Sequence, residues 1–272
     1  MMPLWTMVGH SLRRVRALLL GTGALLAAFQ CLLILAARSI QRSQAFDQLN
    51  ALIPPFVRDL VGPALPSFLS FQGIVCVGYF HLAVLGALTG LSIAFGTTLT
   101  GEVQAGWMDL LLARPLGRHL VVTRSVLTAA ICVLTLLAMM MAGTWLGLQV
   151  FAPPGVSWPA PSLILSLAGN LGLLLLSWTG IATAIGAGLK RRATAAGVCG
   201  LLALGTFLLD YLARVWDPAR SLVWLSPFRY YAPFELLSGQ PLSGQHLLVL
   251  SGLAGAGFLV GYFIFARRDI LH

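Results

Sequence analysis

Six long apolar stretches, separated by short polar or proline-rich connections, dominate this sequence. A helix needs about 20 apolar residues to cross the hydrocarbon core of a bilayer, and each stretch is long enough. We therefore predict an all-α integral membrane protein with six transmembrane helices and additional short interfacial or re-entrant helices. The predicted spans cover about residues 17–37, 74–97, 121–148, 163–189, 193–212 and 247–266.

The composition leaves little room for a separate soluble domain. Of the 272 residues, 58% are hydrophobic and 9% are charged, whereas about 25% of residues are charged in soluble globular domains. The spans use most of the length, so we predict one membrane domain over residues 1–272. The formal net charge of +9 comes from short basic clusters between the apolar stretches. That distribution is a topology signal and does not indicate nucleic-acid binding.

The basic clusters also predict the orientation of the chain. Arg13, Arg14 and Arg16 precede the first span, as the basic region of a signal peptide would. The uncharged stretch 17–37 is longer than a signal-peptide core of 7–15 residues, so we expect an uncleaved first helix. Most basic residues share the side of the N-terminus, and the positive-inside rule then places both termini in the cytoplasm.

Two connections on the outer side have compositions that predict short structural elements of their own. The segment 38–73 holds four prolines among apolar residues, which favours short amphipathic pieces at the membrane interface. The segment 214–245 is rich in aromatic residues, among them Tyr230, Tyr231 and Phe234. Such a segment suits the headgroup belt, or a re-entrant element packed against protein.

Small residues four positions apart recur on the predicted helices, and they permit helices to approach closely. The sequence leaves open whether these pairs pack within one chain or between two copies. The pairs are Gly86 and Gly90, Gly143 and Gly147, Ala182 and Gly186, and Gly257 and Gly261.

Ionisable residues are nearly absent at membrane depth, where an intramembrane enzyme or an ion-coupled carrier would keep them. His81 lies in the middle of a span and Asp210 near the end of one. These two residues leave open an intramembrane lipid-modifying enzyme or a membrane-complex assembly factor as the alternative function. A passive channel would need a ring of charge or a polar filter, and the spans contain neither.

The sequence lacks the P-loop motif that binds nucleotide phosphates. A P-loop needs Gly-Lys followed by Ser or Thr, and the only lysine, Lys190, follows Leu189. We expect no catalytic residue, no cofactor and no metal on this chain. If ATP drives it, ATP and Mg are bound by another polypeptide.

The connection 98–118 carries the most information about a partner. After Gly101 it has the pattern of a short amphipathic helix that Pro115 ends. It is too short and too charged to span, so we expect it to lie across the cytoplasmic end of the bundle. There it would either contact a partner protein that moves it or rest on lipid. Glu102 is expected at its N-terminal end, where the helix dipole favours a carboxylate by about 0.3–1 kcal/mol.

Residues 101–118, GEVQAGWMDLLLARPLGR, resemble the cytoplasmic signature of the type-2 permeases of ATP-binding-cassette (ABC) exporters. Residues 265–270, FARRDI, are similar to the C-terminus of that family. The resemblance implies a permease subunit of a bacterial cytoplasmic membrane, paired as a homodimer or pseudodimer and docked on an ABC ATPase subunit. Many members carry two acidic residues after the glycine, whereas here Val103 and Gln104 follow Glu102.

The resemblance also implies two sets of functional residues. The first set would contact the ATPase: Gly101, Glu102, Gly106, Trp107, Asp109, Arg114, Pro115 and Arg118. The second set would form an outer gate or interface: Tyr230, Tyr231 and Phe234. The transported substrate is not defined by any motif, because a pathway lined by Leu, Ala, Gly and Thr suits lipids, peptides and hydrophobic natural products alike.

Overall fold

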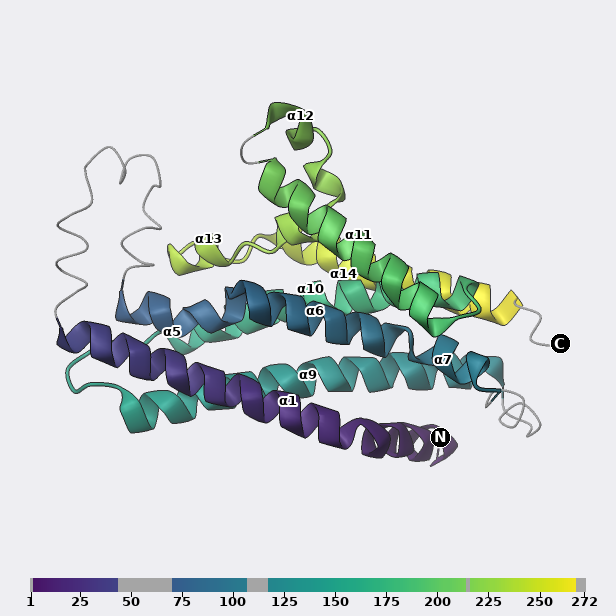
Figure 1. Cartoon of the computed structure of the whole chain (residues 1–272), viewed down its shortest axis with the longest axis horizontal. Helices are drawn as coiled ribbons and strands as arrows, with labels where there is room; N and C mark the ends of the chain where they lie inside the picture. The colour runs from purple at the N-terminus through teal and green to yellow at the C-terminus, as the bar shows by residue number, and fades with distance from the viewer. Residues whose placement is uncertain (1, 44–69, 107–116, 214–215, 268–272) are drawn as a thin grey trace.

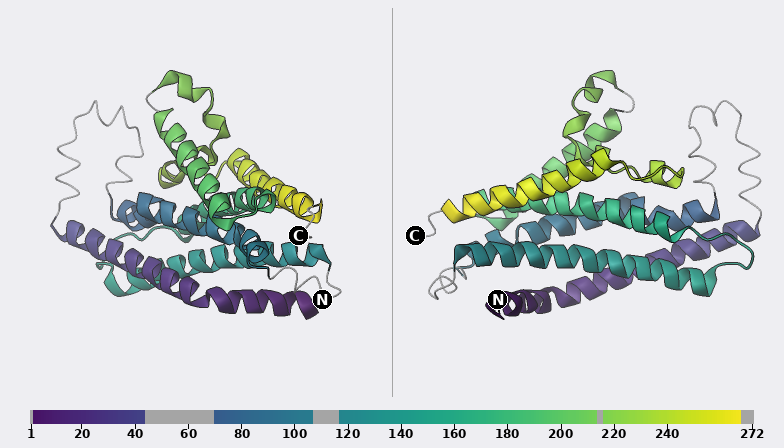
Figure 2. Two further views of the ribbon diagram at one scale, coloured as in Figure 1. Left: turned by 45° about the vertical axis from the view of Figure 1, so that its right-hand side comes forward. Right: turned by 180° about the vertical axis from the view of Figure 1, so that it is seen from behind.

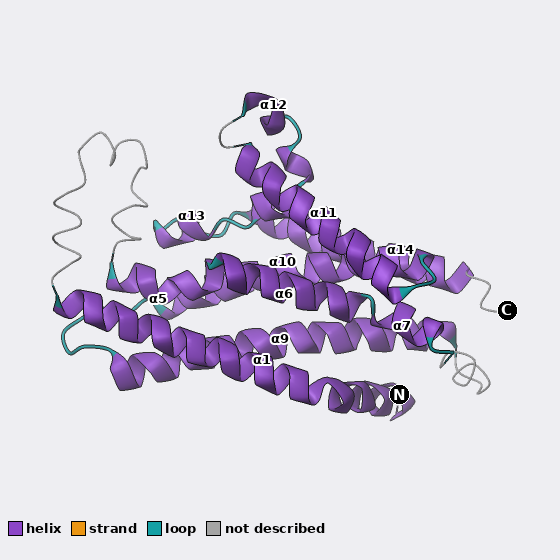
Figure 3. Cartoon of the chain, viewed as in Figure 1, coloured by secondary structure: helices purple, strands orange, loops and turns teal. Residues whose placement is uncertain are grey.

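The computed structural model describes residues 2–43, 70–106, 117–213 and 216–267, and these residues form helices and loops without a strand (Figure 3). Six helical segments are long and apolar enough to cross a membrane, which confirms the predicted fold class. They are α1 (Met2–Arg42), α5 (Phe71–Phe80) continued by α6 (Leu82–Gly96), α9 (Arg118–Phe151), α10 (Pro161–Gly188), α11 (Arg192–Leu212) and α14 (Gly244–Arg267).

The bundle has two ends that differ in what they carry. One end holds the start of α1, the end of α14 and the short helix α7 (Thr98–Gln104), and we call it the α7 end (Figure 1). The helices α5 and α10 begin at the opposite end. The proline-rich outer segment expected over 38–73 lies largely outside the described residues.

The described residues of the connection between α11 and α14 fold into four short helices, in agreement with the predicted short interfacial or re-entrant helices. They are α12 (Asp217–Arg220), η1 (Val223–Leu225), η2 (Pro227–Tyr230) and α13 (Pro233–Leu237). The helix α11 leans away from the other spans, and α12 lies on the far side from α1 and α9 (Figures 1 and 2).

Helix α10 is the central element, and it packs against α6, α9, α11 and α14. Close approach depends on small residues: Gly257 lies against the backbone of Gly180, and Gly261 lies against Thr183. On the other side of the bundle α1 runs along α9, where Gly143 contacts Ala27. These small-residue pairs therefore serve packing within one chain.

The pair Gly86 and Gly90 behaves differently from the other small-residue pairs. Both glycines are exposed, and a Cβ atom built on either meets nothing within 4 Å. Among the described residues, none packs against this face of α6 at the two glycines.

The first span is much longer than the predicted stretch 17–37. The helix α1 has 41 residues, about 61 Å, roughly twice the hydrocarbon thickness. Its first part carries Arg13, Arg14 and Arg16, which are exposed. The basic cluster is therefore part of the helix and not a loop before it.

The second span was predicted as one helix over 74–97, and the structure interrupts it at His81. The backbone of His81 is extended, with φ −61° and ψ 128°. No proline or glycine occurs at this point, so the cause is tertiary: the Tyr231 hydroxyl donates a hydrogen bond of 2.7 Å to the Tyr79 carbonyl. In an uninterrupted helix that carbonyl would accept the N–H four residues later.

Candidate functional site

Helix α7 continues the second span after a bend. The hydroxyl of Thr97 donates to the Ile93 carbonyl at 2.9 Å, and that of Thr98 donates to the Phe95 carbonyl at 2.8 Å. The Ile93 carbonyl also accepts the Thr97 N–H at 3.0 Å, so these hydroxyls add to the backbone hydrogen bonds at the end of α6. Beyond the end of α7, Gly106 adopts φ 70°, a left-handed conformation that favours glycine.

Glu102 points into the protein and forms an ion pair with Arg124 of α9. The side chain of Glu102 is 13% exposed and that of Arg124 is 8% exposed, so the pair is largely removed from solvent. Glu102 is the fifth of seven residues in α7. The expected place at the N-terminal end of a helix is therefore wrong, and the dipole of α7 disfavours this carboxylate. Arg124 provides the compensating charge.

Arg192, the first residue of α11, holds the other side of α7. Its backbone N–H donates to the Gln104 side-chain carbonyl at 2.9 Å, and its guanidinium donates to the Ala94 carbonyl at 3.0 Å. A Cβ atom on Gly101 would lie 2.8 Å from Cδ of Arg192. Glycine at position 101 thus allows the arginine side chain to lie across α7 and reach α6.

The structure places only part of the predicted partner-binding set. Gly101 and Glu102 lie in α7, Gly106 follows that helix, and Arg118 begins α9. The other four residues fall outside the described residues: Trp107, Asp109, Arg114 and Pro115.

Sequence reasoning missed Arg124 and Arg192 as the partners of α7. For Arg124 a signal was present, because an arginine six residues into a span is costly unless it is paired. For Arg192 the sequence gave no such signal, since its side chain binds Ala94, almost a hundred positions earlier in the chain.

A second polar arrangement holds the segment after α11. The Asn170 amide nitrogen donates to the Tyr230 carbonyl at 3.3 Å, and the Ala232 N–H donates to the Asn170 amide oxygen at 3.3 Å. One buried side chain of α10 thus binds the backbone on both sides of Tyr231. Asn170 is a polar residue in the middle of the predicted span 163–189, and the sequence alone indicates no partner for it.

The depth of these contacts decides between the two predicted forms of this segment. Tyr79 lies eight residues into α5 and Asn170 nine residues into α10, about 12 and 14 Å from the end where both helices begin. The residues 230–232 bind at this depth, inside the bundle. We call the segment re-entrant because it enters the bundle, where the Tyr230 carbonyl and the Ala232 N–H are bound by protein, as they would have to be inside a membrane.

The three predicted gate residues have different surroundings. Tyr231 is 8% exposed, and burial raises the pKa of its hydroxyl, which stays protonated and donates to Tyr79. Tyr230 is equally buried, but its hydroxyl bonds to the Trp224 carbonyl within the same segment, at 3.1 Å. Phe234 is 44% exposed, and its ring centroid lies 5.2 Å from that of Phe80.

A cavity of about 390 Å³ lies between the interruption at His81, the end of α11 and the re-entrant segment. Its walls are mainly apolar and aromatic, and it also contains the charged residues Asp210, Arg229 and Glu235. The apolar walls include Phe80, Leu85, Phe207, Phe228, Pro233 and Phe234.

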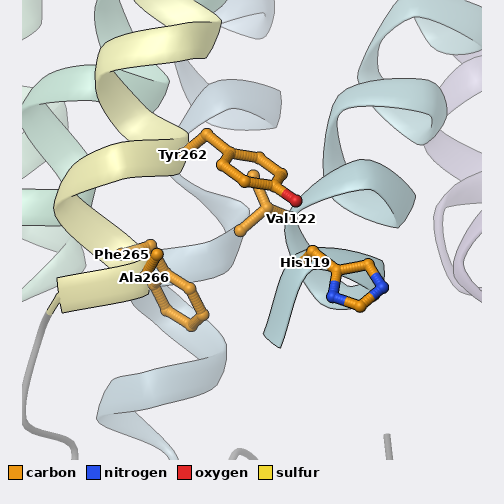
Figure 4. Close-up of a pocket in the computed structure, with 5 residues that line it drawn as sticks. All are labelled: His119, Val122, Tyr262, Phe265 and Ala266. Atoms are coloured by element: carbon orange, nitrogen blue, oxygen red, sulfur yellow. The ribbon is translucent and has the colours of Figure 1, made fainter. Parts of the chain in front are cut away.

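A smaller cavity of about 170 Å³ lies between α9 and α14 near the α7 end. Figure 4 shows Tyr262 reaching from α14 towards α9, with Val122 behind it and His119 at the first turn of α9. Its size and its few lining residues suit a side chain or a few water molecules, and nothing in it points to a larger ligand.

The described part of the chain contains no cluster of side chains that could bind a metal ion. No group of three or more His, Cys, Asp or Glu side chains comes together there. His81 packs edge-to-face on Phe29, with ring centroids 5.3 Å apart. The four cysteines are free thiols.

A scan against protein-family models finds no match to this chain, and a search of curated proteins finds none either.

Proposed function

We propose that this chain is the membrane permease of an ATP-driven exporter whose ATPase is a separate subunit. The observation that carries the proposal is the position of α7. Glu102 joins it to α9, and Arg192 joins it to both α6 and α11. A force applied to α7 therefore reaches three spans directly, which is what coupling to an external motor requires.

The surface available to a motor lies next to these contacts. Gln104, Ala105 and Gly106 are exposed and lead into residues 107–116, which contain half of the predicted partner-binding set. The partner in this proposal is an ABC ATPase that binds ATP and Mg. The permease itself has no P-loop, because its one lysine lacks the required neighbours.

The same proposal includes orientation and assembly. The start of α1, the end of α14 and α7 share one end of the bundle (Figure 1), which we assign to the cytoplasm of a bacterial cell. Two permease subunits pair as a homodimer or pseudodimer. The re-entrant segment with Tyr230, Tyr231 and Phe234 then closes the outer side of the pathway.

Capture of the ATPase tests the proposal. The tagged chain, purified from native membranes in mild detergent, should retain a polypeptide that is labelled by an azido-ATP photoprobe. Ala105→Trp should reduce that retention tenfold or more, because the added ring occupies the exposed surface beside α7. Ala160→Trp, at an exposed alanine of the opposite end, is the control and should retain the ATPase. A chain that never retains an ATPase contradicts the proposal.

The role of Glu102 needs a second variant, because its carboxylate also stabilises α7 through Arg124. Glu102→Ala alone leaves a buried arginine without its partner and disturbs the fold. In the double variant Glu102→Leu, Arg124→Met the ion pair is replaced by apolar side chains of similar size. If this variant folds normally and still fails to retain the ATPase, Glu102 acts on the partner. Normal retention would restrict Glu102 to an internal role.

Orientation is tested by labelling single cysteines in a variant without the four native thiols. Ala105→Cys and Gln240→Cys are both at exposed positions. In spheroplasts an impermeant maleimide should label position 240, and position 105 only after permeabilisation. The reverse pattern would place α7 outside the cell and remove it from any cytoplasmic ATPase.

A further inference from the structure

Basic side chains are concentrated at the α7 end of the bundle. Three lie on α1, three lie where α10 is joined to α11, and one lies at the end of α14 (Figure 1). All seven are exposed: Arg13, Arg14, Arg16, Lys190, Arg191, Arg192 and Arg267. The positive-inside rule accounts for the side of the membrane on which they lie. It does not say what their charges contact in the folded protein.

These charges are not neutralised within the part of the chain that the structure describes. The acidic residue described at this end, Glu102, pairs with Arg124. The seven exposed residues form no ion pair with any described residue. The stretches 107–116 and 268–272 do not alter the balance, since each contains one acidic and one basic residue. The α7 end therefore has an excess of at least seven positive charges.

The opposite end of the bundle is nearly balanced. Its described charges are four arginines and three carboxylates: Arg38, Arg42, Arg220, Arg229, Asp210, Asp217 and Glu235. The stretches 44–69 and 214–215 add two acidic and two basic residues, which cancel. Pairing between groups of one end does not change this formal balance. The two ends of the protein therefore differ strongly in how much they attract anions.

The basic residues lie at the level of the lipid headgroups. Arg16 is followed in α1 by the 21 uncharged residues 17–37, about 32 Å of helix, which matches a hydrocarbon core of about 30 Å. In α14 the 20 uncharged residues 247–266 end at Arg267 in the same way. Arg13 lies three positions before Arg16, about 4.5 Å along the helix, within a headgroup layer about 5–7 Å thick.

The residues before α11 lie at the same boundary. Lys190, Arg191 and Arg192 directly precede the uncharged run 193–209. Arginine and lysine side chains cover apolar surface with their stems and place their charged groups at the interface. At this depth the groups that an exposed side chain meets are the phosphates of phospholipids. Clusters of about 4–8 basic residues beside a membrane span are typical of binding to anionic lipids.

We propose that the α7 end binds anionic phospholipids, whose phosphates are held by the basic residues of α1, of the start of α11 and of the end of α14. Zwitterionic lipids bind less strongly, because the amine of their headgroup offsets the phosphate charge. The interaction requires only that the chain spans a bilayer. It depends neither on the ATPase nor on which side of the membrane the α7 end faces.

The lipid preference of the purified chain tests the proposal. The chain is reconstituted in phosphatidylcholine vesicles with a trace of spin-labelled phosphatidylglycerol or spin-labelled phosphatidylcholine, and electron paramagnetic resonance measures the fraction of each probe that the protein immobilises. Phosphatidylglycerol should be preferred by about threefold or more at low salt. Salt at about 1 M should remove most of the preference, since the screening length is then about 3 Å. Equal immobilisation of the two probes at low salt would overturn the proposal.

Variants locate the interaction. The triple variant Arg13→Gln, Arg14→Gln, Arg16→Gln removes three exposed charges and should lower the preference by about half. The matched control Arg13→Lys, Arg14→Lys, Arg16→Lys keeps the charges and should keep the preference, which separates loss of charge from damage to α1. Arg42→Gln, at an exposed position of the opposite end of α1, should also keep it. An unchanged preference in the glutamine variant would contradict the proposal.

Capture of the ATPase by the same variants separates a lipid surface from a protein surface. A glutamine variant that kept its lipid preference and lost the ATPase would show that these arginines bind protein, and the lipid assignment would be wrong. A wild-type chain that retained the ATPase but preferred neither lipid would leave the export function standing and refute the lipid assignment alone. A clear lipid preference in a chain that never retains an ATPase would support the lipid surface and contradict the exporter.

Discussion

The two polar arrangements of this protein hold their segments by different chemistry. At the α7 end the contact is ionic, between Glu102 and Arg124. At the re-entrant segment it is neutral, made by the Asn170 amide and the Tyr231 hydroxyl. Arg124 lies six residues into α9, about 9 Å from its start, whereas the neutral contacts lie about 12–14 Å from the opposite end.

Depth explains the difference. A charge becomes more costly as it moves from the interface towards the middle of the bilayer, while an amide or hydroxyl can be satisfied by one or two hydrogen bonds. The buried ion pair therefore fixes α7, because removing either Glu102 or Arg124 would leave an unpaired charge inside the protein. The re-entrant segment is held by neutral hydrogen bonds, each of which is weaker than the buried ion pair.

The largest effect is expected when the buried ion pair loses one partner. Arg124→Met leaves the Glu102 carboxylate buried and unpaired, which costs about 3–5 kcal/mol. The free energy of unfolding, measured by titration with SDS in mixed micelles, should fall by that amount. The double variant Glu102→Leu, Arg124→Met should recover most of the loss, because no charge is then left buried.

The exposed ion pair between Asp217 and Arg220 is the matched control. Their side chains are 84% and 64% exposed, and exposed pairs contribute about 0–1 kcal/mol. Asp217→Asn removes this charge pair and keeps the bond from Arg220 to the Ala213 carbonyl, so it should change the unfolding free energy by less than about 1 kcal/mol. Similar losses for Arg124→Met and Asp217→Asn would mean that the Glu102 pair is solvated and does not fix α7.

Removal of the Asn170 amide comes second. Asn170→Leu deprives the Tyr230 carbonyl and the Ala232 N–H of their partner. We expect a loss of about 1–2 kcal/mol, because hydrogen bonds within membranes contribute about 0.6 kcal/mol on average and up to about 1.7. Amide hydrogen exchange in a peptide covering 228–236 should accelerate about tenfold.

Ser177→Ala on the same helix is the control for Asn170. The Ser177 hydroxyl bonds only to the Leu174 carbonyl of its own helix, at 2.7 Å. Its loss should leave exchange in 228–236 unchanged. If both variants accelerated exchange equally, the effect would come from α10 as a whole and the Asn170 contact would not be what holds the segment.

A smaller effect is expected from Tyr231→Phe, which removes one neutral hydrogen bond to the Tyr79 carbonyl and keeps the ring. The cost should be about 1 kcal/mol. Tyr230→Phe is the comparison, since that hydroxyl bonds within the segment to Trp224. Only the Tyr231 variant should speed hydrogen exchange in α5 near the interruption at His81. Equal exchange in both variants would show that Tyr231 does not stabilise that interruption.

Sequence reasoning found the spans because each is an apolar stretch whose length matches the bilayer, and this signal is local. It misjudged the second span, because the interruption at His81 depends on Tyr231, about 150 residues later. From the aromatic content it left the segment 214–245 open between the headgroup belt and a re-entrant element. The choice between an interfacial and a re-entrant position needed the contacts of Asn170.

The candidate site was predicted only as a segment. Gly101 and Glu102 were identified from the motif, but the direction of the Glu102 side chain depends on Arg124, which belongs to another span. Which small residues pack within the chain could not be read from spacing either. Gly257 and Gly261 contact α10, while the equally spaced Gly86 and Gly90 contact no other residue in the described part of the chain. Spacing defines a helix face, and only the fold determines what lies opposite.

The smallest effect is expected at the exposed side of α7. Gln104 accepts a hydrogen bond from the Arg192 N–H, at the start of α11 where no side chain of the preceding residue caps the helix. Gln104 is exposed, so in Gln104→Ala water can take over the released N–H, and the unfolding free energy should fall by at most about 0.5 kcal/mol. Gln149→Ala, at an exposed position of α9, is the control and should have no effect. A loss for Gln104→Ala as large as that for Arg124→Met would reverse the comparison: α7 would then be held chiefly through its link to α11, and the buried ion pair would be secondary.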